Sequence, residues 1–387
     1  MEHLRRLGYY LSIVPSIKKY KGYWVKLEHI VIILICGSFC GLTKLEEIYD
    51  YAKSKPARTM LRKTFNIYLI PSYSHFLRLL KLIDAEELNE VFIAWCRWIV
   101  YDLKKKTISL DGKTVKSTAN MKEYERPLHI VSAIIAENGL TIGQLATDSK
   151  SNEIPAVQEL IKILDVKGAV VTADALNCQK KTAELIIAKE ADYVLAVKEN
   201  HENLYNDIKD IFDYVLNDKV EKNQNEFKKD KTIQTEKNKG RIEQRTSVVI
   251  YDIDWLEGKK NWKGLEAIGM IESVNKITDS KETRYYLLSK QFNAKELLYY
   301  TRNEWAVETM HWLLDVNLKE DSSRVRDKNT QIVLNIFRKI VLNCLTSYKN
   351  FYHSKTAISK LMRINLFDTA ELMQILSDTA ILANITS

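Results

Sequence analysis

Apolar residues are spaced as in helices over the first hundred positions and as in strands from about residue 106 onward. Residues 27–39 are apolar on nearly every side, which predicts a buried helix at the centre of an N-terminal helical unit. Short apolar runs with polar breaks then predict strands. These runs cover 107–110, 128–135, 140–145, 169–173 and 193–197. The dipeptide Asn138-Gly139 between two of them predicts a hairpin.

Helical spacing returns between and after the predicted strands. The predicted helices cover 154–164, 178–190, 200–215, 294–318 and 331–345. Strands that alternate with helices after a hairpin indicate a mixed sheet with helices on both faces. We therefore expect an α/β fold with an N-terminal helical domain.

Further strand-like runs indicate a β-rich insertion at about 216–290. Within it, residues 219–245 are polar and charged without apolar periodicity, and we expect a mobile surface segment there. The expected domains are a helical domain over 1–100, an α/β domain over 101–345 that the insertion interrupts, and a C-terminal helical tail over 346–387. DNA docking and plain packing are both interpretations of the basic helix near residue 78.

The composition narrows the setting. Five cysteines without a C-x-x-C pair argue against a zinc finger or a disulfide framework, and for a reducing cytoplasm. The N-terminus shows no signal peptide, and the apolar run 30–39 is shorter than the ~20 residues that span a bilayer. We therefore expect a cytoplasmic protein without a membrane partner.

Positive charge gathers near the C-terminal end. Residues 323–363 hold nine Lys/Arg and one acid, Asp327, so their net charge equals the +8 of the whole chain. A solvated helix face and a phosphate-binding surface are both consistent with this region. The candidate phosphate contacts within it are Arg324, Arg326, Arg338 and Lys339.

Three acids stand in unusual settings. Asp111 ends a predicted strand and is followed by Gly112, which leaves room for a ligand to approach. Asp174 ends a second strand, and Glu308 lies on a late helix. Carboxylates ~4 Å apart repel by about 4 kcal/mol at an effective dielectric constant near 20, so such a set must share a proton or bind a cation.

Ligation by carboxylates alone selects hard ions, Mg²⁺ or Mn²⁺, over Zn²⁺. Two such ions ~3.5–4 Å apart can hold an attacking and a leaving oxygen in line across a phosphate. This is the chemistry of phosphodiester cleavage and transesterification. The chain has neither a P-loop nor a G-x-S-x-G motif that would indicate another chemistry.

The late helix carries two stripes, counted at ~100° per residue. The apolar stripe is Val307, Met310, Leu314 and Leu318, and the polar stripe is Glu304, Glu308, His311 and Asp315. His311 is interpreted either as a group that orients Glu308 or moves a proton, or as a structural histidine. Trp305 and Trp312 flank the polar stripe, either as core residues or as platforms for an unpaired base.

Several stretches resemble the DDE transposases of bacterial insertion sequences, in the branch of H-repeat-associated proteins. The matching stretches are Leu110-Asp-Gly-Lys-Thr114, Lys150-Ser-Asn-Glu-Ile154, Thr172-Ala-Asp-Ala175 with Cys178-Gln179, Asp192-Tyr-Val-Leu-Ala-Val-Lys-Glu-Asn200, and Trp305-Ala-Val-Glu308 with His311-Trp-Leu-Leu-Asp-Val316. The resemblance implies an RNase H-like mixed sheet flanked by helices, with a β-rich insertion. It also implies an Asp111, Asp174 and Glu308 triad that binds Mg²⁺, with Mn²⁺ as a substitute.

The implied activity is cleavage at insertion-sequence ends and transfer of the freed 3′-hydroxyl into target DNA. The alternatives are an RNase H-like nuclease without strand transfer and an inactive DNA-binding derivative. The implied partners are transposon ends and target DNA, held by a homodimer on paired ends in the bacterial nucleoid. Expected DNA contacts, besides the four basic residues above, are Lys113, Lys198, Arg302, Trp305 and Trp312.

The chain departs from the family around the glutamate. Related transposases carry Tyr-x2-Arg-x3-Glu-x6-Lys, whereas this chain has Thr301, Glu304 and Asp315 at the first, second and last of those places. The family resemblance therefore leaves open whether His311 or Lys319 compensates for the missing lysine or Asp315 assists the metals.

Overall fold

The computed structural model describes residues 9–22, 24–100, 102–118, 127–147, 152–216, 227–238, 241–352 and 354–378. Lys150 and Ser151 of the motif at 150–154 lie outside the described residues. The same holds for 217–226 and 239–240 of the expected insertion and for 379–387 of the expected tail.

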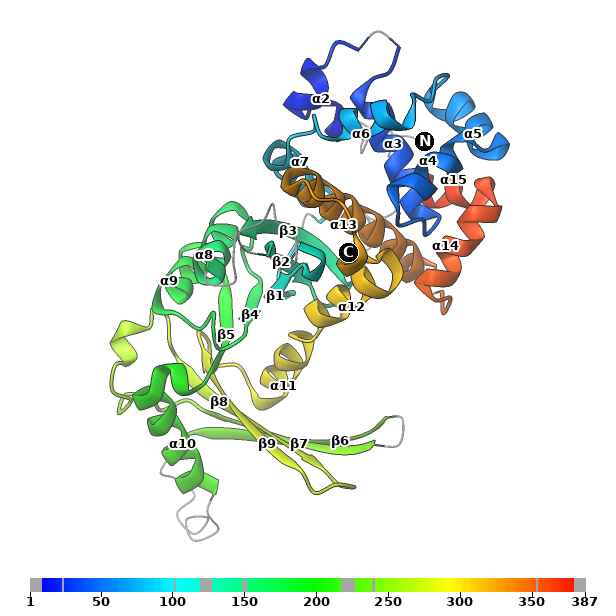
Figure 1. Cartoon of the computed structure of the whole chain (residues 1–387). Helices are drawn as coiled ribbons and strands as arrows, with labels where there is room; N and C mark the ends of the chain where they lie inside the picture. The colour runs from blue at the N-terminus through cyan, green and yellow to red at the C-terminus, as the bar shows by residue number, and fades with distance from the viewer. Residues whose placement is uncertain are drawn as a thin grey trace.

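Within the described residues, nine strands form one sheet in the order β3-β2-β1-β4-β5-β9-β8-β7-β6. The strands are β1 (Thr107–Thr114), β2 (His129–Ile135), β3 (Leu140–Thr147), β4 (Val170–Ala173), β5 (Asp192–Val197), β6 (Lys229–Asn238), β7 (Arg241–Ile250), β8 (Ala267–Asn275) and β9 (Lys281–Leu288). β1 is antiparallel to β2 but parallel to β4, which is parallel to β5. The expected mixed sheet flanked by helices is confirmed (Figure 1).

The β-rich insertion extends this sheet. β9 pairs antiparallel with β5, from Val194↔Leu288 to Val197↔Tyr285, so β8, β7 and β6 continue the same sheet outward. The expectation of a mobile segment is wrong for 229–238, which form β6. Its side chains are largely exposed, and a polar, lysine-bearing edge strand lacks the apolar alternation that would reveal it in a sequence.

Helices cover both faces of the sheet. α8 (Glu153–Ile163) and α9 (Lys180–Ala188) pack on one face, and α11 (Ala294–Asn303) and α12 (Ala306–Leu318) contact β1 from the other. The predicted apolar stripe of α12, Val307 to Leu318, is buried. Beyond β5, α10 (Glu202–Leu216) packs on β9.

The free edge of β3 is covered by α7 (Ala85–Ile99) and by α13 (Lys328–Phe351). The side chain of Asn343 bonds both backbone groups of Thr141, accepting from its N–H at 2.9 Å and donating to its carbonyl at 2.8 Å. Asn89 of α7 donates to the carbonyl of Gln144 at 2.9 Å. These bonds satisfy polar groups that an open edge would leave unpaired.

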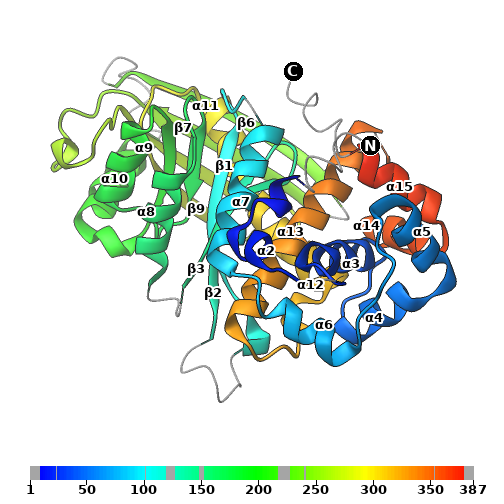
Figure 2. The same cartoon turned by 90° about the horizontal axis from the view of Figure 1, so that it is seen from above.

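The remaining helices gather beyond that edge (Figure 2). They are α2 (Pro15–Lys19), α3 (Leu27–Phe39), α4 (Leu45–Lys53), α5 (Lys55–Phe65), α6 (Tyr73–Leu80), α14 (Ile358–Phe367) and α15 (Thr369–Asp378). As predicted, α3 is buried almost all round. α14 packs on α3 and α15 on α5, so the C-terminal helices join the N-terminal ones in one layer.

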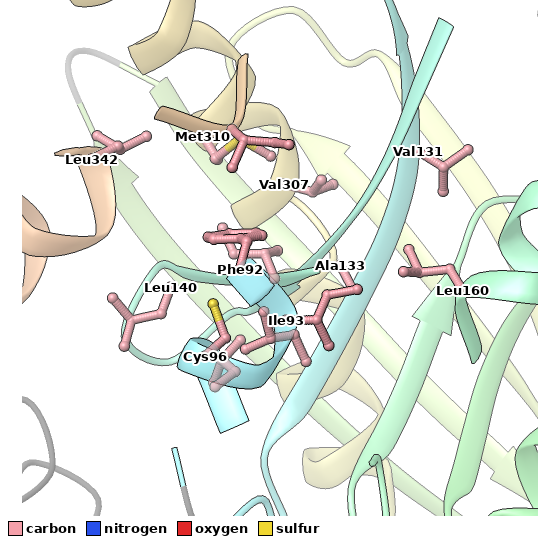
Figure 3. Packing of buried hydrophobic residues seen from close by; sticks show 14 of the residues in the cluster. Phe92, Ile93, Cys96, Val131, Ala133, Leu140, Leu160, Val307, Met310 and Leu342 are labelled. Carbon is pink, nitrogen blue, oxygen red and sulfur yellow. The ribbon is translucent and has the colours of Figure 1, made fainter. Parts of the chain in front are cut away.

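A continuous apolar core links this layer to the sheet (Figure 3). Phe92 and Cys96 of α7, Ala133 of β2 and Met310 of α12 are all buried there. The core therefore fixes α12 against the central strands, and with it the polar stripe that α12 carries.

The predicted helix 294–318 is two helices, α11 and α12, separated at Glu304 and Trp305. Asn303 accounts for the break, because its carbonyl accepts from Ser109 Oγ at 3.1 Å and its side-chain amide donates to Thr107 Oγ1 at 3.0 Å. A helix end tied to β1 in this way places the first turn of α12 beside the strand.

Candidate active site

Asp111 and Asp174 occupy neighbouring strands. In the parallel pair of β1 and β4, Leu110 lies opposite Ala173, and each aspartate is the next residue along its chain. Adjacent strands are ~4.8 Å apart, so the two residues stand side by side. Asp174 directly follows the end of β4, as predicted, whereas β1 continues to Thr114, so Asp111 lies within its strand and not at the predicted end.

β1 presents alternate side chains to α11 and α12, as expected for a strand. Ser109 bonds Asn303, Asp111 Oδ2 lies 3.6 Å from Nδ1 of His311, and Lys113 pairs with Asp315. The polar stripe of α12 therefore faces β1. His311, for which both a role on Glu308 and a structural role were considered, lies beside Asp111.

The negative charges of Asp174 and Glu308 both act on the carboxylate of Asp111. Burial is the main reason that the pKa of Asp111 rises to about 7, and the negative charges of Asp174, Glu153 and Glu308 raise it further. In the described part of the chain, no lysine or arginine lies within 4.0 Å of any of the three triad carboxylates. Burial lowers the pKa of His311 to about 3, so this neighbour is uncharged at neutral pH.

This donor set fits a hard divalent cation. It consists of carboxylate oxygens without an internal counter-charge, the chemistry that Mg²⁺ and Mn²⁺ select. The triad is nevertheless looser than a closed metal cage. Among the described residues, the acids whose ligand atoms lie within 4.8 Å of one another are Asp315, Glu320 and Asp321.

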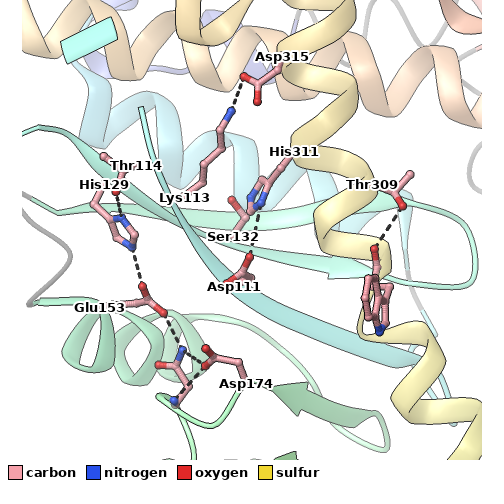
Figure 4. A network of polar contacts seen from close by, with 12 residues as sticks. Asp111, Lys113, Thr114, His129, Ser132, Glu153, Asp174, Thr309, His311 and Asp315 are labelled. Atoms are coloured by element: carbon pink, nitrogen blue, oxygen red, sulfur yellow. Dashed lines mark hydrogen bonds and ion pairs between the residues drawn. The ribbon is translucent and has the colours of Figure 1, made fainter. Parts of the chain in front are cut away.

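That tighter group already holds a cation, the ammonium of Lys113 (Figure 4). Its Nζ lies 2.5 Å from Asp315, 2.7 Å from Glu320 and 3.6 Å from Asp321. We call these four residues the Lys113 clamp. The prediction that Lys113 contacts DNA is wrong, because its side chain is 14% exposed and its charge is already neutralised. The cation that meets Asp315 is therefore Lys113, rather than His311 or Lys319.

The other predicted DNA contacts divide into exposed and buried residues. The exposed ones are Lys198, Arg302, Trp305, Trp312, Arg324 and Arg326. The tryptophans are 53% and 59% exposed, which corrects their interpretation as core residues. Of the six, Arg302 forms an ion pair with Glu236 of β6.

Arg338 and Lys339 are corrections. Only 6% and 1% of these residues is exposed, because both lie on the part of α13 that faces the protein interior. Lys339 donates to Ser132 Oγ at 2.6 Å, and burial lowers its pKa to about 7. Neither side chain is available to a phosphate outside.

Two acids near the triad were missing from the predicted site. Burial is the main reason that the pKa of Glu304 rises to about 7; Arg284 lowers it, whereas Asp174, Asp111 and Glu308 raise it. The signal for Glu304 was its spacing of one helical turn from Glu308. Glu153 is 2% exposed at the start of α8, and its signal was its place in the matching stretch 150–154.

The comparisons with known proteins agree with this geometry. A family model described as "Transposase DDE domain" matches residues 102–344, and one described as "DDE_Tnp_1-associated" matches 9–96. This chain belongs to the DDE transposase family.

Curated relatives of this family member span nearly its whole length. It is 30% identical over 388 residues to "H repeat-associated putative transposase YhhI" of Escherichia coli K12, covering 98% of this chain and 99% of that one. It is 31% identical over 348 residues to "Putative transposase YncI" of Escherichia coli O157:H7, covering 88% and 87%. The resemblance to H-repeat-associated transposases is thus confirmed.

Among solved structures, the chain is similar to a piggyBac transposase in a synaptic complex with hairpin DNA. The TM-score is 0.48 at 11% identity, covering all of this chain and 82% of that one. None of the helices within the described residues combines the length and the apolar character needed to cross a membrane.

Proposed function

We propose that this chain is a DNA transposase that cleaves DNA at insertion-sequence ends and transfers the freed 3′-hydroxyl into target DNA. Asp111, Asp174 and Glu308 hold Mg²⁺, or Mn²⁺ in its place. The observation that carries the proposal is the raised pKa of Asp111, to which the charges of Asp174 and Glu308 contribute, at a site where no lysine or arginine of the described chain lies within 4.0 Å of the three carboxylates.

The protein supplies no lysine or arginine to the triad among the described residues. His311 is uncharged at neutral pH and its Nδ1 lies 3.6 Å from Asp111, so it does not neutralise that carboxylate. Divalent ions bound at the triad would neutralise charge on the phosphate and activate the attacking oxygen. No nucleophilic side chain is then required.

The exposed residues beside α12 suit DNA. Trp305 and Trp312 are two helical turns apart and offer apolar faces on which unpaired bases can stack. Arg324 and Arg326 are exposed between α12 and α13 and add positive charge for phosphate. We propose that these residues hold the transposon end, and that two copies act on paired ends.

The test is a cleavage and joining assay on end-bearing DNA with Mg²⁺. Asp111→Asn, Asp174→Asn and Glu308→Gln should each lower the rate at least about 10³-fold, since each removes several kcal/mol of metal-borne stabilisation. The matched control is Glu159→Gln on α8, whose exposed side chain pairs only with Lys162 among the described contacts. Full activity in the three variants contradicts the proposal, and cleavage without joined products reduces it to a nuclease.

A further inference from the structure

A chain of buried polar contacts runs beneath β1 and ends on Asp174 (Figure 4). It passes from Thr114 through His129 and Glu153 to Asn177, which bonds Asp174. We propose that Glu153 is a positioning residue that acts through Asn177 to fix the Asp174 carboxylate for metal binding. This inference rests on the proposed function.

The hydrogen bonds of Asn177 link Glu153 to Asp174. Its side-chain N–H₂ donates to Glu153 Oε1 at 2.8 Å and to Asp174 Oδ1 at 3.0 Å, and its backbone N–H donates to the same Oδ1 at 3.2 Å. One oxygen of Asp174 thus receives two donors, which holds the carboxylate in one orientation. Its second oxygen forms no hydrogen bond within the described residues and is left for a ligand.

Glu153 and Asp174 together set which way the Asn177 amide points. A carboxylate only accepts hydrogen bonds, so the amide must turn its N–H₂ group, and not its oxygen, toward Glu153. The same N–H₂ group then reaches Asp174. Asn177 is fully buried, with no exposed surface, so water does not compete for this arrangement.

Glu153 is itself held from the other side. Its Oε2 lies 2.8 Å from Nε2 of His129, whose Nδ1 lies 3.0 Å from Thr114 Oγ1. His129 is 1% exposed. Donation from Nε2 to the carboxylate leaves Nδ1 to accept from the threonine hydroxyl, so one tautomer satisfies both bonds.

The backbone of β1 is shaped around this pair. A Cβ placed on Gly112 would lie 2.2 Å from His129 Nε2 and 2.6 Å from Glu153 Oε2. Only glycine at position 112 therefore lets His129 and Glu153 lie this close to the backbone of β1. Residues that support metal ligands in this way commonly change metal affinity 10- to 100-fold when they are replaced.

The experiment measures Mn²⁺ binding to the full chain, by the electron paramagnetic resonance signal of free Mn²⁺, together with thermal unfolding of the metal-free protein. Glu153→Gln keeps the shape of the side chain but lets an amide turn either group toward Asn177. We expect its Kd for Mn²⁺ to rise about 10- to 100-fold. Glu159→Gln on the same helix should bind as the wild type does, with both variants folded.

Asn177→Ser removes the next member of the chain and provides a second test. It should raise the Kd in the same range, and the double variant with Glu153→Gln should bind little worse than either single variant, since both act through one path. A Kd for Glu153→Gln within twofold of wild type overturns the inference. If that variant does not fold, the same threshold applies to Asn177→Ser.

The two possible failures are distinguishable. If the wild type binds no Mn²⁺, or if Asp174→Asn binds it unchanged, the proposed function fails and the inference with it. If Asp174→Asn weakens binding while Glu153→Gln and Asn177→Ser do not, the function stands and only the positioning role is lost.

Discussion

Two groups of acids share the same strand and helix but are balanced in opposite ways. β1 contributes Asp111 to one group and Lys113, two residues on, to the other. α12 contributes Glu308 to the first and Asp315, two turns on, to the second. The Lys113 clamp contains its own cation, whereas the triad has none within 4.0 Å among the described residues.

The pKa values record the difference. Burial would raise the pKa of Glu320, but the charges of Lys113 and Arg338 lower it below its ordinary value. Burial and like charges raise the pKa of Asp111 to about 7. An acid group that the chain neutralises is part of the scaffold. An acid group without a cation from the chain is stable only when it takes up a proton or binds a cation from solution.

The largest expected effect comes from removing the ammonium group of Lys113 from the Lys113 clamp. Lys113→Met leaves the buried Glu320 without its ammonium partner, which should lower the free energy of unfolding by about 3–5 kcal/mol. Urea titration measures it. The control is Lys167→Met, because the side chain of its partner Glu190 is 69% exposed and the loss of this surface pair should leave the free energy of unfolding nearly unchanged. Equal effects of the two substitutions would remove the contrast.

The next effect is metal-linked stability. At a Mn²⁺ concentration of about 100 Kd, the wild type should gain about 2.7 kcal/mol over the chelator-treated protein. Asp111→Asn should lose most of this gain and Asp315→Asn should keep it. Thermal unfolding with and without Mn²⁺ measures both. The reverse result would place the metal in the Lys113 clamp and not in the triad.

The smallest expected effect is on the stability of the metal-free protein, which substitutions in the two groups of acids should change in opposite directions. The raised pKa of Asp111 means that the folded protein binds its proton more tightly than the unfolded chain, so stability falls as pH rises from about 4 to about 7. At pH 8, Asp111→Asn should therefore stabilise the metal-free protein.

Two comparisons check that sign. Asp315→Asn, which removes a partner of Lys113, should destabilise the protein at the same pH. The gain from Asp111→Asn should shrink as the pH falls and disappear below about pH 3, where Asp111 is protonated in both states. A loss of stability in Asp111→Asn at pH 8 would mean that its charge is already balanced within the fold.

Local pattern predicted much of the arrangement. Apolar runs located the first five strands, and the end of β4 located Asp174. The predicted strand 107–110 stopped short of Asp111 and Lys113, which the structure includes in β1. Helical spacing placed Glu308 and Asp315 on the matching stripe.

What pattern missed depends on partners that are distant in the chain. Lys113 meets Asp315 across 202 positions, so its spacing from Asp111 could not tell a phosphate contact from an internal ion pair. Arg338 and Lys339 were assigned to a surface because charge is usually exposed, but inside the protein the charge of Glu320 acts on Arg338, and Lys339 donates to Ser132. β6 was missed because it is stabilised by its pairing with β7, and its own polar residues do not indicate a strand.

The unbroken ladder from β3 to β6 has a mechanical consequence. β5 bonds β9 on one side and β4 on the other, so the outer hairpin β6–β7 and the strands that carry the two aspartates belong to one stiff plate. A duplex bound at that hairpin would act on the whole sheet. A tilt of the sheet would then move Asp111 and Asp174 with it, since no hinge separates them from the hairpin.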